Sequence, residues 1–243
     1  MSAAKQRRGL LVTGTDTGVG KTLVTAALSR ILTQRNLRVG VMKPVETGVI
    51  DPTRLGPDAQ LITEQSGCKA PIAQISPYRF PLAASPELAA GDAGEKIHPT
   101  EIIAVEEQLA EAHDFMLVEG AGGLMVPLRG GYLIADLARE LKYPLLVVTR
   151  PNLGTINHTL LTIHAARTMD LEVAGMIVNR MPANPDRAEE SAPHALASLA
   201  STDLLAVTPD IPGEPSSQVE QLASALEASP TFSWLLAALG IDA

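Results

Sequence analysis

The sequence predicts an α/β fold in which a mainly parallel sheet lies between two layers of helices. Short runs rich in Val, Leu and Ile alternate with longer stretches of helical periodicity, which is typical of consecutive βαβ units. No long linker rich in Pro, Gly or Ser divides the chain, and no internal repeat interrupts it. We therefore expect a single domain over residues 1–243, a length that can bury a core without disulfides or metals.

The strands are predicted from short apolar runs, because parallel strands buried on both faces lack the alternation of half-exposed strands. In chain order these runs are 10–12, 39–42, 115–118, 145–149, 173–178 and 204–207. The stretches with helical periodicity are 22–34, 100–112, 133–141, 156–168 and 187–199, and the chain is again expected to be helical from Ser217. Residues 51–56 and 209–217 are expected to be loops, and Glu106 and Glu107 to lie on a solvated helix face.

Composition and charge exclude several classes of function. The chain has 19 Lys and Arg against 27 Asp and Glu, a net charge of -8 that leaves no broad basic face for nucleic acid. The longest apolar run, 234–239, has six residues, whereas a membrane-spanning helix needs about 20. Cys68 is the only cysteine, which excludes a disulfide framework and a cysteine-based zinc site. No secretory signal is recognised, and we expect a cytoplasmic protein without nucleic-acid or membrane partners.

A glycine-rich segment, 14–22 (GTDTGVGKT), joins the first predicted strand to the first predicted helix. In this context glycines let backbone N–H groups face phosphate oxygens, and the helix N-terminus adds a favourable dipole. Lys21 would reach the β- and γ-phosphates, and the Thr22 hydroxyl would ligate Mg²⁺. The segment therefore predicts a nucleotide site in a P-loop NTPase-like fold.

This segment departs from the usual P-loop in its spacing. Five residues separate Gly14 from Gly20, where the usual motif has four, and Thr15 stands at the expected glycine position. The alternative interpretation is an ordinary glycine-rich turn between a strand and a helix. The Gly-Lys-Thr sequence at the start of a helix favours nucleotide binding over that alternative.

Three charged residues stand just beyond predicted strands or loops. Glu119 follows the strand at 115–118 and precedes Gly-Ala-Gly-Gly, so its carboxylate suits a metal or a phosphate edge. Asp58 begins an apolar-periodic stretch, where a helix N-cap is the alternative role. Lys43 follows the strand at 39–42, where its ammonium could stabilise a transferring phosphoryl group. Taken alone, Glu119 could also be a loop residue and Lys43 a solvated lysine.

A second candidate anion site follows the strand at 145–149. Segment 152–158 (NLGTINH) opens a predicted helix, whose first N–H groups have no partners within the helix and can bind an anion. The alternative is simple capping of that helix by Thr155 or Asn157. All of these candidate residues lie beyond the carboxyl ends of predicted strands or in the loops there, where α/β sheets bind ligands.

Considered together, these motifs resemble the dethiobiotin synthetase family. The matching segments are 12–17 with 20–22, 43–45 with 47–48, 118–123 and 153–158. Their order and approximate spacing match that family from about residue 10 to residue 180. The longer P-loop spacing is itself a trait of the family, so the departure noted above supports the resemblance.

The resemblance implies an ATP-dependent ligase of biotin synthesis that uses Mg²⁺. The family's substrate is 7,8-diaminopelargonic acid, and CO₂ is the carbon donor. One amine forms a carbamate, whose oxygen attacks the γ-phosphate of ATP to give a carbamic–phosphoric anhydride. The second amine then attacks the carbonyl carbon, closes the cyclic urea and expels phosphate.

The resemblance also implies residue roles, by matching motifs. Lys43 would be the principal catalytic cation, and Thr47 would contact the diamine. ATP would be bound by Gly18, Val19, Gly20, Lys21, Thr22, Leu23, Asp58, Glu119, Gly120, Ala121, Gly122 and Asn179, the last being the family's adenine-contacting position. Mg²⁺ would be held by Thr22, Asp58 and Glu119. Gly154, Thr155, Ile156 and Asn157 would bind the substrate carboxylate across the interface of a homodimer.

The sequence differs from many members of the family at four places. Gly18 stands where many members have Glu, and Glu87 stands where many have His after Ser-Pro. Arg180 replaces the Asp of some members, and 207–209 replaces a frequent Gly-x-Ile-Pro. Nucleotide-base preference and the contacts of the C-terminal part therefore stay open.

Two rival classes share the P-loop. Partitioning or positioning ATPases usually carry an extra lysine early in the loop and often a basic amphipathic tail, whereas this loop has no basic residue before Lys21 and 231–243 has no Lys or Arg. Amidoligases such as cobyrinic acid diamide synthetase are usually longer and carry a nucleophilic Cys, whereas Cys68 lies in a polar loop and is interpreted as structural. A family paralogue with another substrate stays open, because of Gly18 and Glu87.

Overall fold

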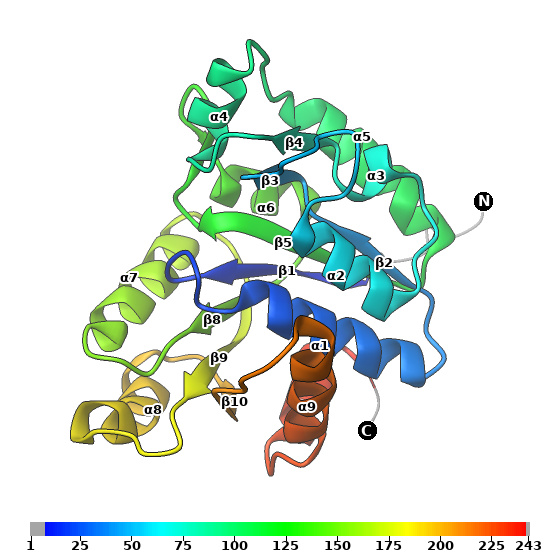
Figure 1. Cartoon of the computed structure of the whole chain (residues 1–243). Coiled ribbons are helices and arrows are strands. Elements are labelled where there is room, and N and C mark those ends of the chain that lie inside the picture. Colours follow the sequence, from blue (N-terminus) through cyan, green and yellow to red (C-terminus); the bar gives the residue numbers. More distant parts are fainter. Residues whose placement is uncertain (1–7, 242–243) are drawn as a thin grey trace, which may run out of the picture.

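Six strands form one central sheet in the order β10-β9-β8-β1-β5-β2 (Figure 1). The computed structural model describes residues 8–241, and every pairing in this sheet is parallel, as predicted. The strands are β1 (Gly9–Gly14), β2 (Val39–Met42), β5 (Phe115–Gly123), β8 (Leu145–Thr149), β9 (Val173–Met181) and β10 (Leu204–Pro209). Because all six run the same way, their carboxyl ends meet at one edge of the sheet.

Helices cover both faces of the sheet and complete the three layers (Figure 1). One face is covered by α1 (Lys21–Gln34), α2 (Pro57–Ser66), α9 (Pro215–Glu227) and α10 (Phe232–Ala238). The other face is covered by α5 (Pro99–Ala112), α6 (Ile134–Leu141), α7 (Thr155–Thr168) and α8 (Arg187–Leu199). None of the described helices, which lie within residues 8–241, is long and apolar enough to cross a membrane.

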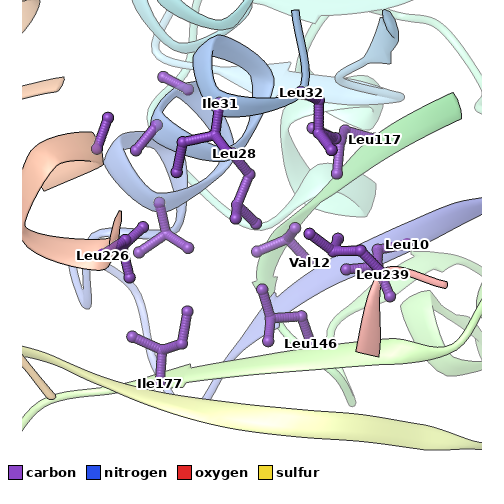
Figure 2. Close-up of a cluster of buried hydrophobic side chains, with 14 of the residues drawn as sticks. Leu10, Val12, Leu28, Ile31, Leu32, Leu117, Leu146, Ile177, Leu226 and Leu239 are labelled. Atoms are coloured by element: carbon purple, nitrogen blue, oxygen red, sulfur yellow. The ribbon is translucent and has the colours of Figure 1, made fainter. Parts of the chain in front are cut away.

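Strand residues alternate between the two halves of the core. Leu10 and Val12 of β1 pack with α1 and α9, whereas Leu11 between them packs on the opposite face. Figure 2 shows this first cluster, where Leu28 of α1 and Leu226 of α9 meet the strand residues. Burying each such side chain stabilises the fold by about 2 kcal/mol, so apolar residues on both faces hold the strands in the middle layer.

Small elements that the sequence analysis does not predict lie beyond the main sheet. They are two short strand pairs, β3 (Val45–Thr47) with β4 (Tyr78–Phe80) and β6 (Pro127–Arg129) with β7 (Tyr132–Leu133), and the short helices α3 (Ile72–Ile75) and α4 (Pro86–Asp92). The four strands and α3 have two to four residues and α4 has seven, which is too short to show a clear period, so pattern alone does not reveal them.

Two further expectations need correction. The loop expected at 209–217 is shorter, because β10 includes Pro209 and α9 begins at Pro215, a residue whose fixed φ suits the first position of a helix. Glu106 is not solvated but fully buried, and its carboxylate accepts a hydrogen bond of 2.5 Å from the Tyr143 hydroxyl. Its neighbour Glu107 is exposed, as expected.

Candidate active site

The register of the sheet brings three of the predicted motifs together. Val12 of β1 pairs with Glu119 of β5, and Met42 of β2 pairs with Val118. Lys43, the residue after β2, therefore lies beside Glu119, although the two are 76 positions apart in the chain. The loop after β1 places Thr22, at the start of α1, next to the same carboxylate.

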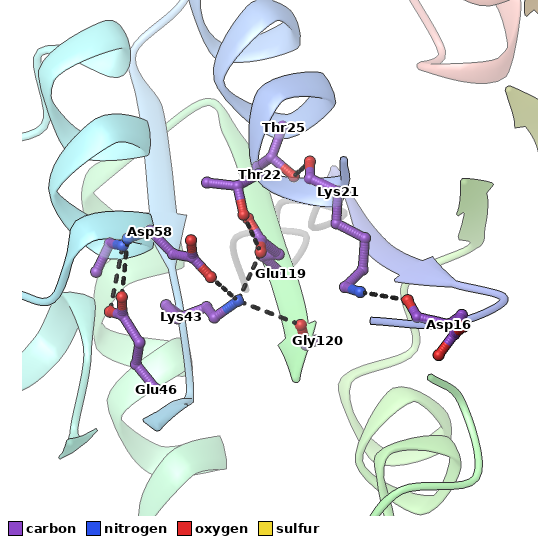
Figure 3. Close-up of polar contacts among 10 residues, drawn as sticks. Asp16, Lys21, Thr22, Thr25, Lys43, Glu46, Asp58, Glu119 and Gly120 are labelled. Carbon is purple, nitrogen blue, oxygen red and sulfur yellow. Dashed lines mark hydrogen bonds and ion pairs between the residues drawn. The ribbon is translucent and has the colours of Figure 1, made fainter. Parts of the chain in front are cut away.

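These residues form what we call the Lys43 centre, defined as Lys43, Asp58, Glu119 and Thr22 (Figure 3). The Lys43 ammonium lies 2.5 Å from Glu119 Oε1, 2.9 Å from Asp58 Oδ2 and 3.5 Å from the Gly120 carbonyl oxygen. The Thr22 hydroxyl donates a hydrogen bond of 2.9 Å to the same Glu119 oxygen. Four side chains from four parts of the chain (α1, the residue after β2, α2 and β5) thus converge on one point.

Burial and charge decide the protonation of the Lys43 centre. The Lys43 and Glu119 side chains are 5% and 0% exposed. Burial alone would lower the pKa of Lys43, but the negative charges of Glu119 and Asp58 outweigh it and raise the pKa. For Asp58 the two effects are reversed. Burial would raise its pKa, but the Lys43 ammonium outweighs burial and holds the pKa below its usual range. Lys43 is therefore a permanent cation and Asp58 a carboxylate.

Lys21 lies on the other side of the phosphate loop. Its ammonium donates a hydrogen bond of 3.0 Å to the Asp16 carbonyl oxygen (Figure 3). Burial and the nearby charge of Lys43 lower the pKa of Lys21 to about 8. The loop turns through Gly18 and Gly20, whose φ angles of +74° and +93° favour glycine. This arrangement leaves a buried cation within a loop of the type that binds phosphate.

The oxygen atoms of the Lys43 centre fit a magnesium ion. Glu119 Oε2 is buried and has no hydrogen-bond partner, so this oxygen is available as a ligand for a cation. Thr22 and Asp58 supply two more oxygens next to it. Within residues 8–241 no group of three or more His, Cys, Asp or Glu could hold a metal ion, but Mg²⁺ needs only one or two carboxylates beside a P-loop hydroxyl.

A cleft of about 810 Å³ opens over the Lys43 centre and the phosphate loop. Eleven of the predicted residues line it, namely Gly18, Gly20, Lys21, Thr22, Leu23, Lys43, Thr47, Asp58, Glu119, Ala121 and Gly122. The lining also includes residues that have no role in the sequence analysis: Thr17, Val45, Glu46, Pro57, Leu61, Ala83, Ala84, Val126, Pro215 and Gln218. Most of these come from the short elements and loops beyond the sheet.

Asn179 is buried behind the phosphate loop and does not line this cleft. Its amide nitrogen donates a hydrogen bond of 2.9 Å to the Val19 carbonyl oxygen, and its amide oxygen accepts one of 2.8 Å from Thr208. A Cβ at Gly20 would overlap the Asn179 amide, which explains the glycine there. Arg180, in the left-handed region at φ +64°, donates to the Gly18 carbonyl oxygen at 3.2 Å. Asn179 and Arg180 thus both fix the backbone of the phosphate loop through hydrogen bonds to its carbonyl oxygens.

The predicted second anion site lies outside the cleft, at the start of α7. Gly154 is the N-cap of that helix, at φ +96°, and Leu153 before it is 87% exposed. A hydroxyl group of β8 anchors this turn: Thr149 contacts Thr155 at 2.7 Å and Thr159 at 3.0 Å. The structure therefore does not bring Gly154, Thr155, Ile156 and Asn157 to the Lys43 centre of the same chain.

Thr149 also reaches the phosphate loop. Its hydroxyl lies 3.0 Å from that of Thr15, and we call Thr15, Thr149, Thr155 and Thr159 the Thr149 cluster. The Thr15 backbone N–H donates to the Val148 carbonyl oxygen at 3.0 Å. Thr15, which stands where the usual P-loop has a glycine, thus ties the phosphate loop to β8 and, through Thr149, to α7.

Two side chains near the cleft have contacts that sequence alone does not suggest. Glu46, between two motif residues, accepts hydrogen bonds from the backbone of α2. Glu87 accepts one of 2.5 Å from the Gly130 N–H, which ties α4 to the β6–β7 turn. Neither position shows a local signal, because each contact depends on a segment that is distant in the chain. Cys68 is buried, with its sulfur 3.6 Å from the His113 ring.

Comparison with known families and proteins supports the motif resemblance. The family described as AAA domain matches residues 8–216. An ATP-dependent dethiobiotin synthetase of Bacillus subtilis (strain 168) is 37% identical over 206 residues, which cover 84% of this chain and 88% of that protein. One of Anaeromyxobacter sp. (strain K) is 41% identical over 204 residues, which cover 83% of this chain and 90% of that protein.

Solved structures of other proteins share the fold at low sequence identity. The septum site-determining protein MinD of Pyrococcus horikoshii, solved with Mg-ADP, superposes with a TM-score of 0.56 at 19% identity, over 96% of this chain and 93% of that one. McdA of Cyanothece, solved with ATP, gives a TM-score of 0.57 at 13% identity, over 99% of both chains. At such identities the likeness shows the P-loop NTPase-like architecture only.

Proposed function

The chain belongs to the dethiobiotin synthetase family, and on that premise we propose that it catalyses the ATP-dependent conversion of 7,8-diaminopelargonic acid and CO₂ into dethiobiotin, ADP and phosphate. Such an enzyme is a ligase that forms carbon–nitrogen bonds. The observation that carries the proposal is the buried Lys43 ammonium, in contact with Glu119 and beside Thr22 of the phosphate loop. It supports the proposal because a cation beside the phosphate loop could stabilise both a γ-phosphate and an attacking oxygen.

The proposed reaction has three bond-forming steps. One substrate amine attacks CO₂, forms a C–N bond and loses a proton, which gives a carbamate. A carbamate oxygen then attacks the γ-phosphorus of ATP, and the bond from that phosphorus to the ADP oxygen breaks. The second amine attacks the carbonyl carbon of the resulting anhydride, loses a proton, and expels phosphate as the cyclic urea closes.

The residues of this chain contribute charge and position in these steps. The nucleophiles belong to the substrates, so no nucleophilic side chain is needed. Lys43 stays protonated because of Glu119 and Asp58, and its charge would stabilise the carbamate oxygen and the transferring phosphoryl group. Lys21 and the loop N–H groups would hold the β- and γ-phosphates, which aligns the two reactants.

Thr22, Asp58 and Glu119 are the residues proposed to hold Mg²⁺. When bound there, the ion would neutralise charge between the β- and γ-phosphates. Lys43 contacts the same two carboxylates and would supply a second positive charge beside the substrates in the cleft. The unpartnered Glu119 oxygen supports this assignment.

The remaining residue roles are proposals that rest on family membership. Thr47 lines the cleft and would contact the diamine, and Gly120, Ala121 and Gly122 would lie near the nucleotide. The Asn179 amide uses one N–H and one oxygen lone pair in its bonds to Val19 and from Thr208, so the adenine contact proposed for it can use the second N–H or the second lone pair. A direct test compares the affinities of wild type and Asn179→Ala for ATP and for GTP.

The turn at the start of α7 supports a role for a second subunit. Segment 154–157 lies outside the cleft of its own chain. Its Thr155 N–H donates to the Asn152 carbonyl oxygen, and the Ile156 and Asn157 N–H groups in the first turn of α7 are those that can bind an anion. We assign this segment to the substrate carboxylate of a partner copy in a homodimer. Mixing an Asn157→Ala variant with a Lys43→Ala variant should then restore part of the activity, since mixed dimers hold one intact site.

The experiment that tests the proposed function measures phosphate release from Mg-ATP and bicarbonate, with and without 7,8-diaminopelargonic acid. We expect phosphate release that depends on the diamine and is matched by dethiobiotin, detected by mass spectrometry. Hydrolysis of ATP that does not depend on the diamine and yields no cyclic urea would instead indicate a switch ATPase or a paralogue with another acceptor.

A further inference from the structure

We propose that Glu46 is a positioning residue, which fixes the start of α2 and thereby holds Asp58 in place for Mg²⁺ and Lys43; this proposal rests on the proposed function. Glu46 is the middle residue of β3 and is only 3% exposed. Figure 3 shows its carboxylate directed at the first turn of α2 and not at Lys43. It stands between the two motif residues Val45 and Thr47.

The contact is a helix cap supplied from another element. The Asp58 N–H donates to Glu46 Oε1 at 2.8 Å, and the Ala59 N–H donates to Oε2 at 3.3 Å. The N-cap residue of α2 is Gly56, which has no side chain to accept these donors. First-turn N–H groups need a partner, and a carboxylate there also interacts favourably with the helix dipole. Glu46 provides both.

Gly56 leaves the space that this contact needs. Its backbone, at φ -72° and ψ 171°, is extended and open to any residue, so conformation does not require glycine there. A Cβ at this position would, however, overlap the Glu46 carboxylate. Glycine is therefore needed for room, which shows how closely β3 and the start of α2 fit together.

The consequence for the site lies in Asp58. Its side chain is 41% exposed, and its Oδ2 reaches the Lys43 ammonium at 2.9 Å. The Asp58 N–H is the one that Glu46 holds, so Glu46 fixes the backbone from which this carboxylate reaches Lys43. Loss of this cap would let the first turn of α2 fray and move the second carboxylate away from Glu119 and Thr22.

The test compares ADP affinity with and without Mg²⁺, measured by calorimetry, for wild type, Glu46→Ala, Glu46→Gln and Gly56→Ala. Partners that orient metal ligands typically contribute tenfold or more to metal affinity. We expect the gain in ADP affinity on adding Mg²⁺ to fall by about tenfold in Glu46→Ala and Gly56→Ala. ADP affinity in EDTA should change little, because Lys21 and the phosphate loop are untouched.

Glu46→Gln keeps the size of the side chain but presents an amide that can accept only one of the two N–H groups. We expect an intermediate effect. Gln60→Ala is the matched control, because Gln60 lies on α2 and its side chain contacts only Glu64 in the described chain. It should match wild type in both affinities.

A double-mutant cycle tests whether Glu46 acts through Asp58. In an Asp58→Ala background, Glu46→Gln should have no further effect on the Mg²⁺ dependence. If Glu46→Ala and Glu46→Gln lower the midpoint of thermal unfolding but leave the Mg²⁺ dependence of ADP binding at the wild-type value, Glu46 is merely structural and the proposal is wrong. The binding assay does not use the diamine, so its outcome stands apart from that of the proposed function.

Discussion

The Lys43 centre and the Thr149 cluster are both polar clusters at the carboxyl edge of the sheet, but different forces hold them. In the first, a buried ammonium contacts two carboxylates at 2.5 and 2.9 Å. In the second, four neutral hydroxyls meet at 2.7 to 3.0 Å. The buried charges are mutually dependent, since removing one leaves the others uncompensated. The hydroxyls carry no charge, so losing one of them leaves hydrogen bonds unmade but no buried charge uncompensated.

The two clusters therefore have different roles, the first in the proposed chemistry and the second in connecting structural elements. The Lys43 centre offers charge at the place where phosphoryl transfer is proposed, and its residues cannot be exchanged for neutral ones without loss of that charge. The Thr149 cluster offers no charge, but it connects the phosphate loop with the start of α7. We expect substitutions in the first region to affect turnover, and substitutions in the second to affect stability.

Lys43→Ala should give the largest effect. Removal of one charge aimed at the transition state typically lowers turnover by 10² to 10³-fold, and we expect kcat to fall by about that factor. ATP affinity should change far less, because Lys21 and the loop remain. Steady-state kinetics and calorimetry separate the two quantities, and Lys69→Ala, at an exposed lysine, is the control. Equal losses in kcat and in ATP affinity would contradict the assigned role.

Lys21→Ala should act on binding. Lys21 would pair with the phosphates of the nucleotide. Truncation of one partner of such a buried charge pair costs about 2 kcal/mol or more, so ADP and ATP should bind about thirtyfold more weakly. Calorimetry with Mg-ADP measures this directly. Comparison with Lys43→Ala separates the two roles. Loss of the Lys21 ammonium should mainly weaken nucleotide binding, whereas loss of the Lys43 ammonium should mainly lower kcat. Unchanged ADP affinity would disprove the phosphate-loop assignment.

Thr149→Val should break the Thr149 cluster and leave the charges intact. Three hydroxyls then lose a partner, and we expect the free energy of unfolding to fall by about 1 to 3 kcal/mol. The fall in kcat should be only a few-fold, and Thr149→Ser should restore both values. Urea unfolding and kinetics check this. A loss of turnover as large as that of Lys43→Ala would show that the two regions do not divide as described.

Asp114→Asn should give the smallest effect. It measures how much a solvent-exposed charge pair contributes to stability, for comparison with the Lys43 centre. Arg38 contacts Asp114 at 2.7 Å, but the Arg38 and Asp114 side chains are 63% and 28% exposed. Surface pairs of this kind contribute little to stability, and salt screens them. The unfolding free energy should fall by less than in Thr149→Val, and less again in high salt. A larger loss would mean that exposure does not separate this pair from the Lys43 centre.

Local patterns were enough to predict the frame of the molecule. Buried parallel strands require apolar residues on both faces, so each main strand is visible as a short run, and the helices between them have their own period. The Gly-Lys-Thr motif is visible because backbone N–H groups can face phosphate only where glycines allow the turn. The short elements β3, β4, β6 and β7 are not visible, since two or three residues cannot display a period.

Within the site, the residue types were predictable but their environments were not. Lys43 and Glu119 are apparent as charged residues at strand ends, yet the burial of Lys43 and its raised pKa follow from β5 and α2, which lie far along the chain. The cap from Glu46 to α2 has no local signal for the same reason.

The sequence by itself thus determined the layers, the order of the elements and the position of the phosphate loop, because hydrophobic burial and backbone conformation act over a few neighbouring residues. Only the tertiary structure decided which charges pair, which hydroxyls meet, and that segment 154–157 lies outside the cleft of its own chain. Coulomb energies and hydrogen bonds depend on distances of a few ångströms between atoms, and such distances are set by packing rather than by spacing along the chain.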